Sequence, residues 1–436
     1  MHLYRFTVPM TAAFDAPNGS AAMTLEARRA GDGFTQVVRL WSDAHPEPLI
    51  LQAAEIRPGA SAALLIHPWR AEFWIDGHLM DEEWPDGKLP AEKIPVPRFQ
   101  AFGIAVTADP DADDRANLPL RAPDFHTDCG ISANDGSPRV IGRLLSQNGE
   151  NPAEGWRPSD PGVYAGDCMP FADTDPDGAE RYHVLYLKDR RHHRSKWHKG
   201  AHQWAHLSTR DFLNWNLHPL AVSIDDPREG SICTGSWLKT GDGTHVLYYT
   251  VRQMDSSPAP ILRSVSEDGI HFRRDPDFRF VLSERYHGPS ARDPKVVRAE
   301  DGAWHMFVTT SLMTGNMAGR GCLAHLVSQD GAAWRETDPI YVSPDGDQPE
   351  CSDYFAKDGW HYLIFSHRGR GEYRMSREPF AGWICPEDPQ IPCESVPKTA
   401  LWNGRILFAG FSRIEGYAGT LTFTEAWQEP DGTLRF

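Results

Sequence analysis

The stretch Val265-Ser-Glu-Asp-Gly-Ile-His-Phe272 sets the pattern of the chain, because similar stretches occur three more times. In each copy an apolar strand residue is followed by Ser and by an acidic turn that closes on an aromatic residue. The other copies are Leu207–Trp215, Val327–Trp334 and Met375–Trp383, and the closing aromatic residues fall 57, 62 and 49 residues apart. Ahead of the four copies lie aromatic-rich strand patterns at 182–187, 245–251, 304–309 and 360–366.

A fifth strand pattern of this kind, Arg405–Phe411, precedes Leu421–Trp427 and the last turn. Repeats of this period are typical of propeller blades, each built from four antiparallel strands. Because the repeat reads as strand throughout, a solenoid of helix pairs is excluded. We therefore predict an all-β protein in which residues 159–436 form a five-bladed β-propeller.

Residues 1–115 carry short runs in which apolar and polar residues alternate. They include Phe34–Leu40, Ser61–Ile66, Glu72–Ile75 and Gln100–Val106. Such alternation without helices predicts half-buried antiparallel strands packed as a β-sandwich. The piece from Ala71 to Pro85 resembles the strand and hairpin of concanavalin-like, laminin-G-type sandwiches. Residues 116–158 lack clear periodicity, and we interpret them as a connector.

Composition narrows the class of protein. The chain has 436 residues, 40% apolar and 24% charged, which is typical of a globular protein. A formal net charge of −16 argues against a nucleic-acid partner. The sequence has neither a membrane-span pattern nor a signal-peptide pattern at its start, and its seven Cys lack a CxxC pair. We therefore expect a cytoplasmic protein without a disulfide framework.

Three acids mark the starts of the predicted inner strands. In a propeller the first strand of each blade lines the central channel, so Asp167, Asp293 and Glu350 should meet at one mouth. Acids at strand starts are also ordinary turn formers, so the set of three carries the argument rather than any one member. Arg292 should keep Asp293 charged, which leaves Glu350 to hold a proton. This division between carboxylates is what glycosidic bond cleavage requires.

The residues in this order resemble glycoside hydrolase family 32, which contains invertases, inulinases and levanases. The resemblance rests on Gly166-Asp-Cys-Met-Pro-Phe171, Gln203–Trp215, Cys233-Thr-Gly-Ser236, Arg292-Asp-Pro294 and Glu350-Cys351. It implies a retaining fructofuranosidase with Asp167 as nucleophile, Asp293 as transition-state stabiliser and Glu350 as acid/base. It further implies that Arg292, Thr234, Ser236 and Trp197 line the fructosyl subsite.

The sequence departs from the family pattern in three places. The family's Asn-Asp-Pro-Asn-Gly around the nucleophile is replaced by Gly-Asp-Cys-Met-Pro-Phe. The next strand, where the family has a Gln and an Asn-Pro, reads Leu187-Lys-Asp-Arg-Arg-His-His193. The sandwich-like segment precedes the propeller, whereas in the family it follows. The substrate therefore stays open.

The segment Lys188–Trp204 is the most basic part of an acidic chain. It can be a solvated loop, or a subsite for a second sugar in which Trp197 or Trp204 stacks and cations bind hydroxyls or an anionic group. His193 is a further candidate for binding the substrate there. A zinc site built from His192, His193, His198, His202 and His206 is not favoured, because their spacing is not distinctive. We expect neither a metal nor another cofactor.

Several functional alternatives share these residues. A fructosyltransferase or a difructose-anhydride-active enzyme would use the same three acids. An inverting arabinofuranosidase or xylosidase, as in the related family 43, would differ in the spacing of its carboxylates. A non-catalytic carbohydrate-binding propeller would not need all three acids. In each case the partner is a small oligosaccharide, and the sandwich serves packing, dimerisation or sugar binding.

Overall fold

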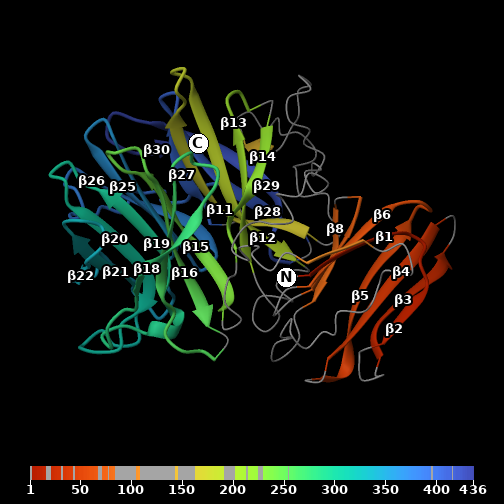
Figure 1. Cartoon of the computed structure of the whole chain (residues 1–436). Coiled ribbons are helices and arrows are strands. Elements are labelled where there is room, and N and C mark those ends of the chain that lie inside the picture. Colours follow the sequence, from red (N-terminus) through yellow and green to blue (C-terminus); the bar gives the residue numbers. More distant parts are fainter. Residues whose placement is uncertain are drawn as a thin grey trace.

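The computed structural model describes most of the chain. The described residues are 2–15, 21–30, 33–42, 45–66, 71–76, 78–83, 105–108, 143–145, 163–190, 202–212, 215–223, 229–253, 255–393, 396–414 and 416–436. Figure 1 shows the N-terminal strands in red to orange and the remaining strands in yellow to blue. Within the described ranges, no helix has the length and apolar character needed to cross a membrane.

The N-terminal strands form two antiparallel sheets. The first has the order β8-β7-β6-β1-β9 and the second the order β2-β3-β4-β5. Their bounds are β1 (His2–Thr7), β2 (Ala12–Asp15), β3 (Ala21–Ala30), β4 (Gly33–Ser42), β5 (His45–Ile56), β6 (Ser61–Ile66), β7 (Ala71–Ile75), β8 (His78–Glu83) and β9 (Ala105–Ala108). The sandwich predicted from the alternating runs is therefore present.

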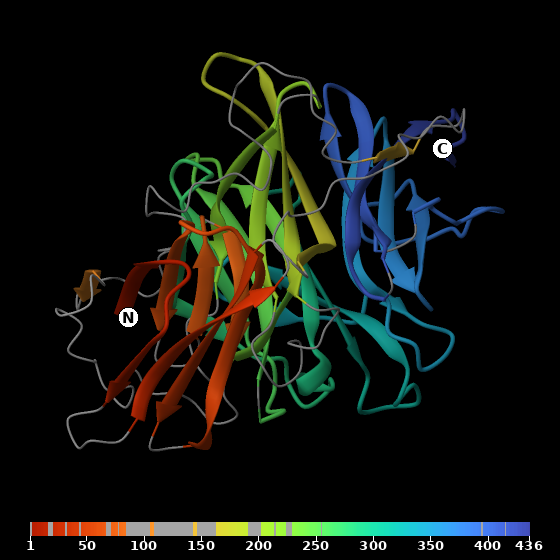
Figure 2. The same cartoon turned by 90° about the vertical axis from the view of Figure 1, so that its right-hand side faces the viewer.

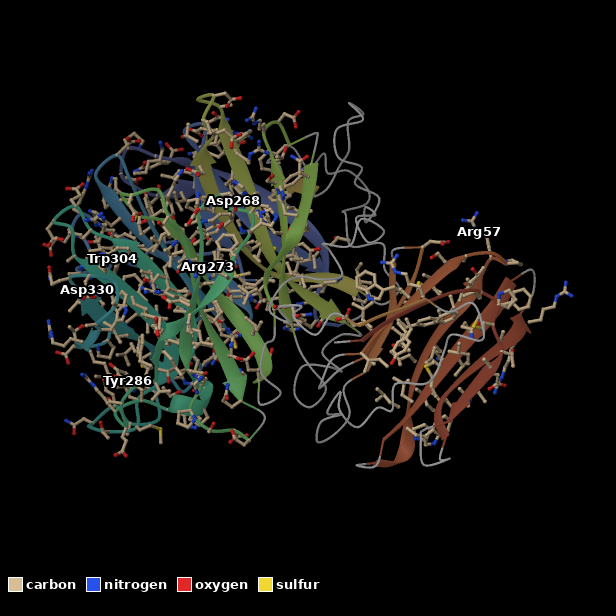
Figure 3. All side chains as sticks on the ribbon, in the orientation of Figure 1. Arg57, Asp268, Arg273, Tyr286, Trp304 and Asp330 are labelled. Atoms are coloured by element: carbon tan, nitrogen blue, oxygen red, sulfur yellow. The ribbon has the colours of Figure 1, made fainter. Side chains whose placement is uncertain are left out.

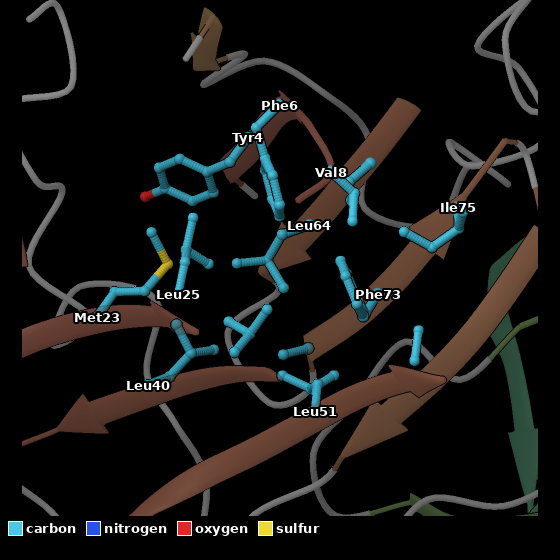
Figure 4. Packing of buried hydrophobic residues seen from close by; sticks show 14 of the residues in the cluster. Tyr4, Phe6, Val8, Met23, Leu25, Leu40, Leu51, Leu64, Phe73 and Ile75 are labelled. Atoms are coloured by element: carbon cyan, nitrogen blue, oxygen red, sulfur yellow. The ribbon is translucent and has the colours of Figure 1, made fainter. Parts of the chain in front are cut away.

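One apolar cluster fills the space between these two sheets. Along β1, Tyr4 and Phe6 are buried while Arg5 and Thr7 point outward, as the period of two in a strand requires. Figure 4 shows the cluster to which Tyr4 and Phe6 belong. It also contains Leu64 of the first sheet and Leu25 of the second. Burial of this shared face holds the two sheets together.

The remaining strands form the five blades of the propeller. Blade one comprises β11 (Val163–Thr174), β12 (Glu180–Arg190), β13 (Gln203–Thr209) and β14 (Trp215–Val222); blade two comprises β15 (Glu229–Lys239), β16 (His245–Gln253), β17 (Ile261–Ser266) and β18 (Arg273–Phe280). The short 3₁₀ turn η4 (Gly288–Ser290) leads into blade three, with β19 (Arg292–Arg298), β20 (Trp304–Ser311), β21 (Gly321–Ser328), β22 (Arg335–Glu336) and β23 (Tyr341–Val342). Blade four has β24 (Glu350–Lys357), β25 (Trp360–His367) and β26 (Arg370–Ser376); blade five has β27 (Lys398–Trp402), β28 (Arg405–Arg413), β29 (Gly419–Gln428) and β30 (Leu434–Arg435).

The blades follow one another in chain order, as the turn from Figure 1 to Figure 2 makes visible. The prediction of four strands in each blade is wrong for blade four, whose outer edge is reduced to isolated bridges such as Met375↔Ile384. Blades one and five are joined where Ala165 of β11 pairs with Gly419 of β29. Strand β10 (Arg143–Leu145), from the predicted connector, pairs in parallel with β29. The proposed domain limits remain predictions.

The repeated turn that revealed the blades has a simple local cause. Asp268 Oδ1 accepts the backbone N–H groups of Ile270 and His271, each at 2.8 Å, and Ser266 Oγ accepts that of Gly269 at 3.0 Å. Asp330 makes the same contacts in blade three, and Figure 3 labels both aspartates. The glycine after each Asp has a positive φ of about 70°, which Gly adopts without strain.

Candidate active site

A cavity of about 240 Å³ is lined by residues of all five blades. The three predicted acids lie on its wall, Asp167 from β11, Asp293 from β19 and Glu350 from β24. Arg292 and Thr234, which the sequence also singled out, line the same cavity. Residues distant in sequence are therefore brought to one end of the inner strands, as a propeller requires.

A β-bulge shapes the inner strand of each of the first four blades. In all four, the pairing with the second strand slips by one residue at the cavity. The slips begin after Ala165, Ile232, Arg292 and Glu350. A bulge bends its strand and redirects side chains, so these four strands share one device for presenting groups to the cavity.

The three acids occupy different places within this shared bulge. Glu350 is the last regularly paired residue, Asp293 is the first bulged residue, and Asp167 is the second. The sequence predicted that the three acids occupy equivalent positions in their blades. All three do lie in the bulged segment, but each stands at a different position within it. Asp293 and Cys351 share one place in the bulge, and both have positive φ, of 57° and 52°. Such backbone costs about 1–3 kcal/mol in a non-glycine residue and is concentrated at functional sites.

Asp293 is buried and held by donors from two other blades. Thr234 Oγ1 donates to its Oδ1 at 2.7 Å, and the backbone N–H of Cys351 donates to its Oδ2 at 3.0 Å. Burial opposes ionisation of this carboxyl, but the charges of Arg292 and Lys398, together with the two hydrogen bonds, outweigh it. The pKa of Asp293 is consequently lowered, and the group is an anion at neutral pH.

Arg292 connects two of the acids. Its Nη2 donates to Oε1 of Glu350 at 2.9 Å, and its Nε lies 3.5 Å from Oδ2 of Asp293. The guanidinium is itself fixed, because Nη1 donates to the carbonyl of Ser290 at 2.9 Å and to Oε1 of Gln348. The sequence predicted that Arg292 pairs with Asp293, whereas its shorter contact is with Glu350. The Glu350 side chain is 47% exposed, so this ion pair is open to solvent on the Glu350 side.

Asp167 receives a donor on each carboxylate oxygen. The hydroxyl of Tyr417 donates to Oδ1 at 2.7 Å, and the thiol of Cys351 lies 3.6 Å from Oδ2. Burial raises the pKa of the Cys351 thiol well above its usual range, so the group stays protonated and can act as a weak donor. Contacts from blades four and five therefore reach the acid on blade one.

A buried cation lies among the inner strands. Lys398 of β27 donates from Nζ to the carbonyl of Gly235 in the bulge of blade two, at 2.8 Å. Burial lowers the pKa of Lys398, while the nearby charges of Asp353 and Asp293 oppose that shift. Asp353 also contacts Lys295 Nζ at 2.5 Å and accepts the backbone N–H of Thr399 at 2.5 Å. These contacts join blades two to five around the channel.

Comparison with known proteins agrees with this architecture. Residues 174–379 match the model of the glycosyl hydrolases family 32 N-terminal domain. This part of the propeller, just under half of the chain, is therefore similar to glycosyl hydrolase family 32. The matched region includes Asp293 and Glu350, while Asp167 lies just before it.

Curated relatives resemble the chain in sequence, and solved structures resemble it in fold. A sucrose-6-phosphate hydrolase of Escherichia coli is 26% identical over 59% of this chain and 55% of its own length, and one of Bacillus subtilis is 30% identical over 45% and 41%. The chain thus spans about half the length of these relatives. The structure of sucrose-6-phosphate hydrolase from Lactobacillus gasseri matches with a TM-score of 0.52 and 15% identity, over 62% of this chain and 61% of that one. Fructan 1-exohydrolase IIa from Cichorium intybus matches with a TM-score of 0.50 and 16% identity, over 64% and 59%. At these identities the structures support the fold alone.

Two predicted subsite residues lie behind the cavity and not on its wall. Trp204 is fully buried in a core cluster, and its indole N–H donates to the carbonyl of Cys233 at 3.0 Å. Its ring therefore supports the bulge of blade two and has no face open to a sugar. Ser236 Oγ accepts the backbone N–H of Val296 at 2.9 Å, which ties blade two to blade three.

The basic segment is described only at its two ends. Trp197 and His193 lie outside the described residues, so their proposed contacts with the substrate remain predictions. At the ends, Asp189 and His202 are both buried and meet at 2.6 Å between Oδ1 and Nε2. Within the described ranges, His, Cys, Asp and Glu side chains form no group of three suited to a metal ion.

Sequence reasoning missed three residues that complete the site. Tyr417, Lys398 and the thiol of Cys351 contact or neutralise the predicted acids. Cys351 was quoted as part of Glu350-Cys351 but was given no role of its own. Tyr417 and Lys398 belong to the fifth blade, where neither residue lies in a recognisable motif.

Proposed function

We propose that the protein is a retaining glycoside hydrolase that removes a β-fructofuranosyl unit from a small oligosaccharide. The observation that carries this proposal is the meeting of three carboxylates in one cavity, with Arg292 in contact with two of them. The similarity to glycosyl hydrolase family 32 and the names of the relatives support the same reaction. Sugar binding alone would not need three acids.

The proposed mechanism gives each acid one task. Asp167 attacks the anomeric carbon and forms a covalent fructosyl ester, while Glu350 gives its proton to the departing sugar oxygen. Glu350 then removes a proton from water, which attacks the same carbon and releases fructose and Asp167. Asp293, kept anionic in its buried setting, binds sugar hydroxyls and stabilises the positive charge of both transition states.

The size of the cavity favours a small substrate. At about 240 Å³ it is near the lower end of typical ligand pockets, about 300 Å³, and suits one terminal sugar unit. Arg252 and Arg413 also line it. The named relatives include sucrose-6-phosphate hydrolases and a raffinose invertase, so sucrose, its 6-phosphate and raffinose are the substrates to test first. A cytoplasmic location and association through the sandwich remain predictions.

The test is product analysis by carbohydrate chromatography with the wild type and an Asp167→Asn variant. Release of fructose by the wild type and a loss on the order of 10⁴-fold in the variant are expected, because the nucleophile is removed. Asp173→Asn, on the same strand but paired with Lys239, is the control and should keep most activity. Unchanged turnover in Asp167→Asn would refute the assignment.

The same reaction mixture separates the alternatives. Fructose first released with retained anomeric configuration supports attack by Asp167, whereas inversion supports the family 43-like alternative. Oligosaccharides longer than the substrate would indicate transfer of the fructosyl group to a sugar instead of water. Sugar binding without turnover in the wild type would favour a carbohydrate-binding propeller.

A further inference from the structure

Tyr417 lies beside Asp167 although the two residues are 250 positions apart in the chain. Its hydroxyl donates to Asp167 Oδ1 at 2.7 Å and accepts the backbone N–H of the same residue at 3.2 Å. One hydroxyl thus binds both the side chain and the main chain of Asp167. Such a pair of bonds restricts rotation of the carboxylate about its side-chain torsions.

The space for this hydroxyl exists because residue 166 is glycine. A Cβ atom at Gly166 would lie 2.8 Å from Tyr417 Oη and 3.1 Å from its Cε1. Distances this short would force one of the two residues to move. Gly166 stands where the family motif has Asn, so this departure from the motif removes the Cβ that would meet the Tyr417 hydroxyl.

Tyr417 is itself held between the last blade and the first. Its ring stacks on His202 with centroids 5.4 Å apart and an interplanar angle of 25°, and it contacts Phe411 edge-on at 5.3 Å. The next residue but one, Gly419, pairs with Ala165 at the junction of blades five and one. The ring position is therefore fixed by the closure of the propeller.

The phenol is suited to act as a donor. Burial and the neighbouring charge of Asp167 raise the pKa of Tyr417 well above its usual range, so the hydroxyl keeps its proton. The O–H bond to Oδ1 is short, whereas the thiol contact of Cys351 with Oδ2 is long at 3.6 Å. The shorter O–H contact therefore fixes the Oδ1 side of the carboxylate more firmly than the thiol fixes the Oδ2 side.

We propose that Tyr417 is a positioning residue that fixes the orientation of Asp167 for attack, in a site where glycine precedes the nucleophile. The inference rests on the proposed fructosidase function. Tyr417 forms no bond to the sugar in this scheme and acts through Asp167. It also favours the ionised form of Asp167, since a hydrogen bond to a carboxylate stabilises its anion.

The test is a Tyr417→Phe variant, which keeps the ring and removes the hydroxyl. With sucrose, kcat should fall about tenfold to a hundredfold, the range for one hydrogen bond to a charged group, while KM stays within about twofold. The acidic limb of the kcat/KM profile should move to higher pH, because Asp167 loses a bond that favours its anion. Tyr362→Phe, which removes a buried hydroxyl bonded to the Gly432 carbonyl at 2.7 Å, is the matched control. If kcat and the acidic limb of Tyr417→Phe match those of the control, the proposal is overturned.

A second measurement does not depend on activity. Urea unfolding of the wild type, Tyr417→Phe, Asp167→Ala and the double variant forms a cycle that measures the coupling of the two side chains. The stability effects of the two changes should not add, because each removes the same contact. Additive effects would overturn the proposal even if Tyr417→Phe were inactive. If the cycle showed clear coupling but the wild type cleaved no fructoside, the proposed function would be refuted while the contact between Tyr417 and Asp167 would stand.

Discussion

The inner strands of the first four blades are kinked where they reach the cavity, whereas β27 of the fifth blade pairs regularly along its whole length. The kinked strands carry the acids, Thr234 and Cys351 into the cavity wall. The regular strand brings Lys398, which is buried among its neighbours. Irregular backbone thus presents the reactive groups, while regular backbone supplies the charge that stabilises them.

After the loss of the nucleophile in Asp167→Asn, the largest effect is expected from the removal of the Asp293 charge at the bulge of blade three. Asp293→Asn keeps the size of the side chain, and Asn tolerates the positive φ at this position. The loss of the anion should lower kcat/KM on the order of 10³-fold with little change in fold, since the charge faces the transition state. Steady-state kinetics and circular dichroism together measure both effects.

A matched control exists in the same propeller. Asp358 also has a positive φ, of 48°, but lies in a turn with a 76% exposed side chain. Asp358→Asn should leave kcat/KM unchanged. If Asp293→Asn retained activity within about tenfold of this control, the carboxylate would not have the role proposed for it.

A smaller but substantial effect is expected from the regular strand. Lys398→Met removes the buried cation and leaves the Gly235 carbonyl and the Asp293 charge without it. The free energy of unfolding should fall by about 4 kcal/mol, as for other broken buried charge pairs. Lys357→Met, which removes a cation 3.6 Å from an exposed carboxylate, should cost under about 1 kcal/mol.

Lys398→Met should also change how the free energy of unfolding depends on pH. The lowered pKa of Asp293 stabilises the fold above its unfolded pKa, about 3.9, and this contribution is lost as pH falls through the folded value. Without Lys398 the folded pKa rises and the contribution shrinks. Urea unfolding at several pH values should therefore show a smaller acid-dependent loss in Lys398→Met than in the wild type. An equal loss in both proteins would show that Lys398 does not stabilise the anion.

The bulge itself can be tested by filling its space. A Cβ at Gly235 would lie 1.8 Å from the carbonyl oxygen of Tyr248 and 2.9 Å from the Trp204 ring, so the bulge of blade two cannot keep its shape. Gly235→Ala should lower the free energy of unfolding by about 2–3 kcal/mol, the usual cost of overpacking. Gly241→Ala, whose nearest contact would be 3.6 Å, is the control. Equal stability of the two variants would mean that the bulge adapts freely.

The difference between the two kinds of strand also explains what could be read from sequence. The blades were predictable because Asp268, Asp330 and their glycines fix each turn within a few residues. The three acids were predictable because Arg292-Asp293 and Glu350-Cys351 are local patterns. Each of these signals is complete within a short window of sequence.

What sequence could not supply depends on the bulges and on contacts between distant blades. Thr234 and Ser236 are two positions apart and would share a face in a regular strand, but the slip after Ile232 sends one to the cavity and the other to Val296. Trp204 is indistinguishable in sequence from a tryptophan that stacks on sugar. Tyr417 contacts Asp167 only because the fifth blade of the propeller packs against the first.

The smallest effect concerns a region away from the bulges. His183, His206 and His218 lie together on β12 to β14, with 2.9 Å between Nδ1 of His183 and Nε2 of His206, and ring centroids of His206 and His218 4.4 Å apart. Burial lowers the pKa of all three, that of His218 to about 4, and the neighbouring histidines and Arg181 add to the effect. The folded protein therefore keeps these rings neutral at pH values where the unfolded chain protonates them.

This cluster predicts a loss of stability in acid that does not come from the cavity. Because the folded pKa values are lowered, the stabilisation is complete above the unfolded value of about 6.5 and is lost as pH falls towards the folded values. His218→Gln removes one titrating ring, so between pH 7 and 5 it should lose about 1 kcal/mol less stability than the wild type. Tyr362→Phe, which changes no group that titrates between pH 5 and 7, is the control and should follow the wild type. If His218→Gln also followed the wild type, the His218 ring would contribute nothing to the acid sensitivity of the fold.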